Sequence, residues 1–182
     1  MPHFHESLPR IVSVDDLVEL RASSVDEGDA VARAILDHLP HFSRWFPWAT
    51  KTYSPEGYVQ WLSELPAWDE GQWEYSIYVA PTHSTKNLVG RVSVFINPQD
   101  VFEFGYWLIP SAQGQGIMTR SLERIEQLMA ERGISNAEIW VEAGNERSQK
   151  LAVRNGYSEV RRDSQRASNP GVEHIVLSKA LT

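Results

Sequence analysis

The spacing of hydrophobic residues changes along this chain of 182 residues. Apolar and polar residues alternate in residues 73–80, 88–96 and 102–109, which is the two-residue period of a half-buried β-strand. Strands joined by short polar segments pair antiparallel, so the sequence predicts a three-stranded meander, with a turn at residues 97–100. An amphipathic helix follows, with its apolar face at Met118, Leu122, Ile125 and Met129.

The segment before the meander favours helices. Apolar residues recur at helical spacing up to Leu39, and we expect Pro40 to end this first helix. Ser54 followed by Pro55 is typical of a second helix N-terminus, because Ser caps free N–H groups and Pro fits the first turn. Residues 14–21 fit either a short strand or a helix. The apolar positions are Val31, Ile35 and Leu39 in the first helix and Tyr58, Trp61, Leu62 and Leu65 in the second.

After Gly133, which ends the amphipathic helix, the pattern predicts a strand, a helix and two strands, at residues 136–143, 145–155, 157–162 and 172–181. The whole order predicts an α+β fold with a mixed, mostly antiparallel central sheet flanked by helices. The sheet changes to parallel pairing within residues 102–140, and ligands tend to bind in the crevice at such a switch. The length fits a single domain, residues 1–182.

Composition excludes several classes of function. The chain has no cysteine, which excludes disulfide scaffolds, cysteine-ligated metals and a cysteine nucleophile. Asp and Glu number 24 against 17 Lys and Arg, and the net charge of −7 argues against nucleic acid and fits an amine better. The six histidines lack metal-ligand spacing. No apolar run could span a membrane and the N-terminus lacks a secretory signal, so we expect a cytoplasmic protein without metal or membrane contact.

Residues 113–119, Gln-Gly-Gln-Gly-Ile-Met-Thr, lie between the third strand and the amphipathic helix. Glycines let the backbone approach a ligand closely, and the free N–H groups of a helix N-terminus favour an anion such as a pyrophosphate. Taken alone, this spacing fits an ordinary turn equally well. The three-glycine fingerprint of dinucleotide-binding domains is missing.

Residues 105–119, GYWLIPSAQGQGIMT, together with residues 145–157, NERSQKLAVRNGY, resemble the GNAT superfamily of acetyl-CoA-dependent N-acetyltransferases. They are most similar to its RimJ/RimL-like branch, which acetylates N-terminal amines of ribosomal proteins. The resemblance covers nearly the whole chain. It implies a GNAT-like fold in which the strand switch forms a cleft for acetyl-CoA, the acyl donor.

The resemblance assigns the cofactor to the glycine turn and to the strand before it. The family pattern falls on Gln113, Gly116 and Met118, and Met in the last position is usual in the RimJ/RimL-like branch. The turn would hold the pyrophosphate through its N–H groups, and the strand would bind the pantetheine arm through its backbone. The implied cofactor contacts are Trp107, Leu108, Ile109, Gln113, Gly114, Gln115, Gly116, Ile117, Met118, Thr119, Asn145 and Ser148.

Asn145 has two roles open to it. It fits the N-cap of the following helix, whereas the family has this Asn contact the pantetheine amide, and the two roles are compatible. The superfamily's usual tyrosine is replaced by Ala152. The resemblance therefore assigns the donor for the departing thiolate to Ser148, near the CoA sulfur.

Acetyl transfer also needs an acceptor amine that has lost its proton. Strict alternation places Glu103 on the opposite strand face from Phe104 and Tyr106, and a Glu within an aromatic strand is unusual. Glu103 is therefore the predicted base, with a solvated strand-end Glu as the alternative. Related proteins often carry a Glu where this chain has Val160, and Glu159 faces the other way.

Five of the seven Trp lie within residues 45–73. Such clusters are usually core, because Trp buries a large area. The family places this region over the acceptor end of the cleft. The predicted acceptor-binding residues are therefore Trp45, Trp48, Trp61 and Glu103, with the aromatic faces suited to a cation.

The sequence thus predicts an N-acetyltransferase that moves an acetyl group to a primary amine, either a protein N-terminus or a small molecule. The transfer is direct, within a ternary complex, because no cysteine exists to carry the acetyl group. The alternative is a non-catalytic acyl-CoA-binding sensor or regulatory protein, which the departure at Val160 leaves open. A homodimer is also considered.

Overall fold

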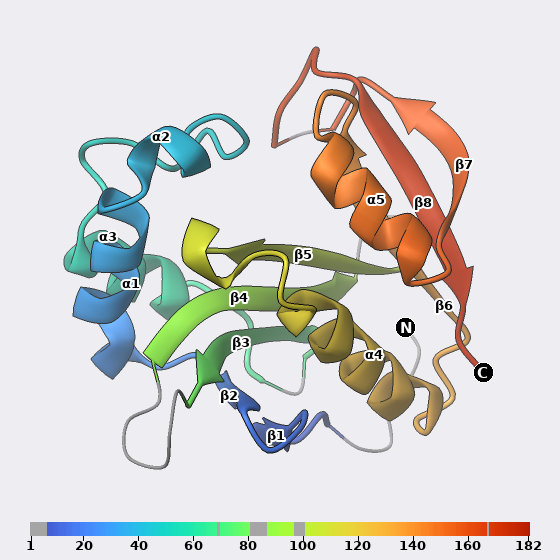
Figure 1. The fold of residues 1–182 in the computed structure, drawn as a ribbon, viewed down its shortest axis with the longest axis horizontal. Helices are drawn as coiled ribbons and strands as arrows, with labels where there is room; N and C mark the ends of the chain where they lie inside the picture. Colours follow the sequence, from blue (N-terminus) through green and yellow to red (C-terminus); the bar gives the residue numbers. More distant parts are fainter. Residues whose placement is uncertain (1–6, 69, 81–86, 97–100, 167) are drawn as a thin grey trace.

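The computed structural model describes residues 7–68, 70–80, 87–96, 101–166 and 168–182. Within them, one sheet has the strand order β1-β2-β3-β4-β5-β6-β8-β7 (Figure 1). The strands are β1 (Ile11–Ser13), β2 (Val18–Ala22), β3 (Gln72–Val79), β4 (Asn87–Ile96), β5 (Phe102–Leu108), β6 (Asn136–Glu142), β7 (Ser158–Asp163) and β8 (His174–Ala180). The helices are α1 (Gly28–Leu36), α2 (Leu39–Phe42), α3 (Pro55–Ser63), α4 (Ile117–Ala130) and α5 (Glu146–Arg154), with short 3₁₀ turns at Val25–Glu27 and Pro110–Ala112.

The junction between β5 and β6 is the parallel pairing in an otherwise antiparallel sheet. These two strands pair only at residues 102–104 and 137–139 and then separate. The mixed, mostly antiparallel sheet and its predicted switch are confirmed. After Phe104, β5 no longer pairs with β6, and a gap separates the two strands.

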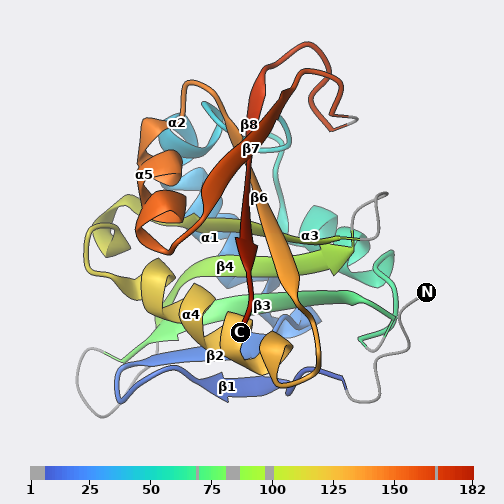
Figure 2. The ribbon, with the colours of Figure 1, turned by 90° about the vertical axis from the view of Figure 1, so that its right-hand side faces the viewer.

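Helices cover the two faces of the sheet (Figures 1 and 2). Val92 and Val94 of β4 point into the larger core, which includes the buried faces of α4 and α5. Arg91 points the other way, beneath α3, where its guanidinium lies 3.1 Å from Glu74 and over the ring of Trp61. A second, smaller core joins α1, α2 and α3 to β4 and β5.

Most predicted elements are confirmed within a residue or two. Residues 14–21 lead into strand β2, and β1, which the sequence did not predict, pairs with it. The first helix was predicted to include Leu39 and end at Pro40, but α1 ends at Leu36. Pro40 instead lies in the first turn of the separate helix α2, where its missing N–H costs nothing. The predicted turn at 97–100 lies outside the described residues.

Strands β4 and β5 approach very closely at Gly90, which pairs with Leu108. A Cβ at Gly90 would lie 2.3 Å from the backbone oxygen of Trp107 and 2.5 Å from Leu108 Cδ2. No side chain fits there unless β5 moves, so glycine is required by the close approach of the backbones.

Gly90→Ala is expected to lower the free energy of unfolding by about 1–3 kcal/mol, because the added methyl overpacks against backbone atoms. Gly57→Ala is the matched control, since a Cβ on this exposed helical residue meets only Ser54 Oγ at 3.7 Å. The control should leave stability unchanged or raise it by up to about 1 kcal/mol. Urea unfolding measures both, and equal stability of Gly90→Ala and the parent would contradict the packing argument.

Candidate active site

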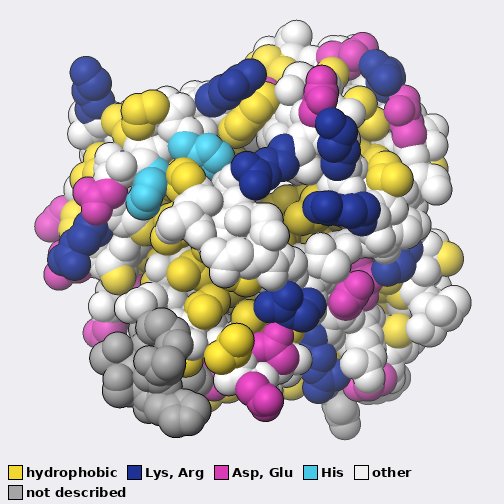
Figure 3. Space-filling model, viewed as in Figure 1, with side chains coloured by type: hydrophobic (Ala, Val, Ile, Leu, Met, Phe, Trp, Pro, Cys, Tyr) yellow, Lys and Arg dark blue, Asp and Glu magenta, His cyan; other side chains and the backbone are white. Residues whose placement is uncertain are grey.

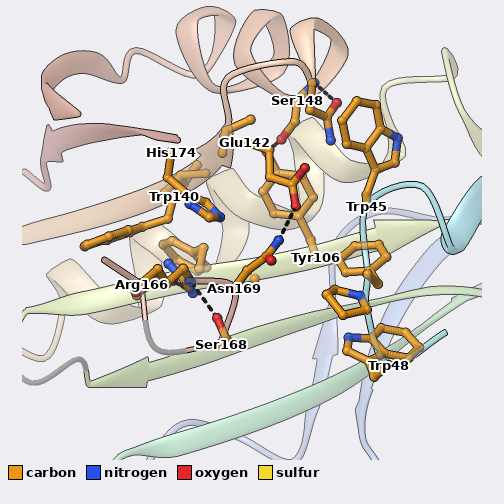
Figure 4. Close-up of a pocket in the computed structure, with 18 residues that line it drawn as sticks. Trp45, Trp48, Tyr106, Trp140, Glu142, Ser148, Arg166, Ser168, Asn169 and His174 are labelled. Carbon is orange, nitrogen blue, oxygen red and sulfur yellow. Dashed lines mark hydrogen bonds and ion pairs between the residues drawn. The ribbon is translucent and has the colours of Figure 1, made fainter. Parts of the chain in front are cut away.

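A cavity of about 430 Å³ lies where β5 and β6 separate. Its lining includes residues 103–106 of β5, residues 139–142 of β6 and residues 45–48 after α2. Asn145 and Ser148 line it from the start of α5, and residues of the β7–β8 loop line it from the other side (Figure 4). The predicted catalytic residues Glu103 and Ser148 therefore line the same cavity.

The glycine turn lies at the N-terminus of α4. Gly116 is the N-cap in the left-handed conformation, with φ 71°, and no side chain of the described residues caps this helix end. The side chains of Ile117 and Met118 are buried in the core, so they can offer a ligand only their backbone N–H groups. Thr119 is half-buried. This arrangement of exposed glycines and uncapped N–H groups fits a pyrophosphate.

Gln113 braces the turn through its side chain. Its Nε2 donates to Leu108 O at 3.0 Å and lies 3.0 Å from His41 Nε2 on α2. Burial lowers the pKa of His41, and the Arg147 charge lowers it further, which favours the neutral ring that accepts from Gln113. The Gln113 Nε2 group is thus already engaged within the protein.

Basic side chains surround the turn although the chain is acidic overall. A Cβ at Gly114 would lie 3.9 Å from the Arg147 guanidinium, and Arg120 Nη1 donates to Gln115 O at 3.0 Å. Figure 3 shows Lys and Arg side chains around a hollow on the face where α2, α5 and the start of α4 meet. The net charge of the chain gave no sign of this local excess, which suits phosphate groups.

Ser148 on α5 and Tyr106 on β5 form a hydrogen-bonded hydroxyl pair in the cavity lining, with 2.8 Å between Oγ and the phenol oxygen. The predicted N-cap role of Asn145 is confirmed, because its Oδ1 accepts from Ser148 N at 3.2 Å. Burial raises the pKa of Tyr106 to about 12, although the bond to Ser148 opposes this. The phenol therefore keeps its proton near neutral pH. Local sequence patterns place Tyr106 in the strand but do not indicate its partnership with Ser148.

Glu103 is buried, with 3% of its surface exposed, and forms an ion pair with Arg166 of the β7–β8 loop. Burial raises the pKa of the Glu103 carboxyl, while Arg166 opposes the rise. The Arg166 guanidinium also lies 4.9 Å from the centre of the Trp140 ring. The sequence placed Glu103 on the correct strand face, but gave no sign of Arg166, which lies far away in the chain.

Trp45 and Trp48 lie on one side of the pocket and Trp140, His174 and Arg166 on the other (Figure 4). The structure does not bring Trp61 to this cavity.

Neither Val160 nor Glu159 lines the cavity. Val160 is exposed, and Glu159 pairs with Arg162 at the surface. The pocket is also lined by Glu142, Asn169 and His174, which no local sequence pattern indicates as site residues.

Two further observations concern metals and membranes. In the part of the chain that the structure describes, no three His, Asp or Glu side chains are grouped to hold a metal ion. Among the described helices, none has the length and apolar character to cross a membrane.

The sequence matches the family model described as the acetyltransferase (GNAT) domain over residues 18–158. A comparison with curated protein sequences found no match. One similar solved structure is RimL, a ribosomal L7/L12 α-N-protein acetyltransferase in complex with coenzyme A, with 25% identity and a TM-score of 0.80 over 94% of this chain and 98% of that chain. Another is a Salmonella typhimurium acetyl transferase that modifies the N-terminal serine of ribosomal protein L7/L12, with 24% identity and a TM-score of 0.81 over 94% and 99%.

A third is the microcin C7 self-immunity acetyltransferase MccE in complex with acetyl-CoA and AMP, with 20% identity and a TM-score of 0.81 over 95% and 97% of the two chains. These matches define an acetyl-group transferase. The chain belongs to the GNAT acetyltransferase family and is an N-acetyltransferase. The predicted resemblance and fold are confirmed, and the CoA-bound relatives support acetyl-CoA as a ligand.

Gly116→Val is expected to weaken CoA binding at least tenfold, because a β-branched residue at φ 71° strains the turn and its Cβ would lie 2.8 Å from Arg120 Nη1. Gly133→Val is the control. It has a similar φ of 79° beyond the other end of α4, with nothing within 4 Å of its Cβ. Calorimetric titration with CoA should show normal affinity for the control. Equal affinities in both variants would show that the turn does not hold CoA.

Proposed function

We propose that the protein transfers the acetyl group of acetyl-CoA directly to a primary amine within a ternary complex. The observation that carries this proposal is that one cavity at the strand gap is lined by the hydroxyls of Ser148 and Tyr106, by carboxylates and by tryptophan rings. Acetyl-CoA supplies an activated acyl group whose thioester carbonyl an amine can attack. We also propose that the whole chain serves this one activity as a single domain.

Different residues around the gap would bind different parts of CoA. The N–H groups of residues 114–119 and the nearby Arg147 fit the phosphates of CoA. Arg120 lies beside the same turn, but its guanidinium is paired with Asp15 at 2.6 Å. The open edge of β5 from Gly105 onward offers backbone groups to the pantetheine amides, because β6 no longer pairs with it. This placement would direct the thioester toward Ser148.

Ser148 and Tyr106 are proposed to stabilise the departing thiolate. Tyr106 can donate to Ser148 Oγ, which leaves the Ser148 proton free to point at the sulfur. A hydrogen bond between two hydroxyls polarises both, so the serine becomes a better donor. This pair takes the place of the tyrosine that Ala152 replaces.

The acceptor is proposed to be a protein N-terminus, in keeping with the activities stated for the RimL-type relatives. Trp45, Trp48 and Trp140 offer aromatic faces to the acceptor, and Glu142 adds a carboxylate to the wall. Small-molecule amines remain the competing class. The carboxylate of Glu103, the base that the sequence predicts, is already engaged by Arg166. The cytoplasmic location and the homodimer also stay predictions.

The experiment that tests the function is an acceptor screen with acetyl-CoA. The panel contains peptides with N-terminal serine or alanine, free amino acids and small amines, and the readouts are free CoA thiol and the mass of the acetylated product. Transfer to at least one amine is expected. CoA binding without any transfer would favour the sensor instead.

Ser148→Ala is expected to lower turnover by about 10²–10⁴-fold, and Tyr106→Phe by about tenfold, because it removes one supporting hydrogen bond. Tyr106 is protonated below its pKa of about 12. The loss of turnover in each variant should therefore stay constant between about pH 6 and 9. Ser158→Ala, on the exposed edge strand β7, is the control and should keep parental turnover. Steady-state kinetics with saturating acetyl-CoA measures this. Parental turnover of Ser148→Ala would contradict the assignment.

A further inference from the structure

His174 is a buried histidine in the wall of the cavity. It begins β8, only 5% of its surface is exposed, and it lines the cavity at the strand gap. Its Nδ1 lies 2.8 Å from Val172 O. A carbonyl oxygen can only accept, so Nδ1 carries the proton and Nε2 keeps its lone pair in the neutral ring.

The other basic groups of the cavity are already engaged. Glu103 is paired with Arg166, and Glu142 Oε1 accepts from Asn169 Nδ2 at 2.8 Å. His174 Nε2 has no hydrogen-bond partner among the described residues. Imidazole is also the side-chain base that titrates nearest to neutral pH, which suits proton transfer better than a carboxylate does.

The sheet places acidic residues on both sides of His174. Glu142 on β6 and Asp163 on β7 are its direct partners in the strand register, so all three side chains point to one face. Asp163 Oδ1 accepts from Gln165 N at 2.6 Å, which fixes its carboxylate. A positive charge that forms on His174 would therefore lie between two carboxylates, and Arg166 is the one cation that lines the same pocket among the described residues. Its charge is offset by Glu103.

We propose that His174 Nε2 is the base that takes the proton from the acceptor amine, an assignment that rests on the proposed function. The ammonium gives one proton to Nε2, and the freed nitrogen lone pair forms the C–N bond with the acetyl carbonyl carbon. The C–S bond breaks with its electron pair going to sulfur. The second nitrogen proton ends on sulfur as CoA thiol, and His174 returns its proton to solvent. Glu103 then acts as a positioning residue that holds Arg166 and the β7–β8 loop.

The test compares His174→Asn and His38→Asn. Asn can donate to Val172 O as Nδ1 does, but it cannot take up a proton. His38 is the matched control, because its Nδ1 likewise bonds a backbone carbonyl, Ala34 O at 2.9 Å, outside the cavity. Rates are measured between about pH 6.5 and 9.5 with the panel member that the parent acetylates fastest. CoA affinity is measured in parallel to show that each variant is folded, and His174→Gln replaces His174→Asn if the latter binds no CoA.

The expected result is a loss of about 10²–10⁴-fold in kcat/KM for His174→Asn near pH 7, with normal CoA affinity. The loss should become smaller as pH rises, because a larger fraction of the amine is then already deprotonated in solution and needs no base from the protein. The control should stay within about twofold of the parent. Added imidazole should restore part of the turnover of His174→Ala.

Three results would overturn the assignment. The first is His174→Asn turnover within about threefold of the parent at neutral pH, and the second is a loss that is equal at every pH. The third is a Glu103→Gln variant that shows the pH-dependent loss while His174→Asn does not. If the parent itself binds CoA but acetylates no amine, the proposed function fails and this assignment with it. If Ser148→Ala is impaired but His174→Asn is not, only this assignment fails.

Discussion

The gap between β5 and β6 is the constraint on which the rest of the structure depends. Antiparallel neighbours can share hydrogen bonds along their whole length, whereas these two parallel strands pair over three positions and then separate. Each is followed by a helix, so the N-termini of α4 and α5 both lie beside the opening, near the carboxyl ends of the strands. The helix ends thereby bring free N–H groups, the cap of Asn145 and the Ser148 hydroxyl to one place.

The alternation of β5 then separates the two halves of the chemistry. Glu103 points to the face covered by the β7–β8 loop, and Tyr106 points to the face covered by α5. In the proposed function, one strand therefore borders the acceptor side with one of its faces and the thiol side with the other.

Local sequence patterns were sufficient for most of the fold and for part of the site. Period-two segments predicted β3, β4 and β5. The glycine turn was visible as a local motif, whereas Ser148 was assigned only through the family resemblance. Contacts between distant residues could not be predicted, because nothing near Glu103 in the sequence indicates Arg166, and nothing near His174 indicates Glu142. Trp61 was wrongly predicted to bind the acceptor, because it lies close to Trp45 and Trp48 in the sequence. In the structure its ring packs on Arg91 instead. Pro40 was interpreted as a stop, although a proline can equally begin a helix.

The segment from α2 to Trp48 contacts both ends of the crevice. His41 meets Gln113 at the cofactor turn, and Trp45 lies against Gly144 and lines the pocket at the other end. One short segment thus supports the cofactor turn at one end and forms part of the pocket wall at the other. A substitution that displaces this segment would therefore disturb both places at once.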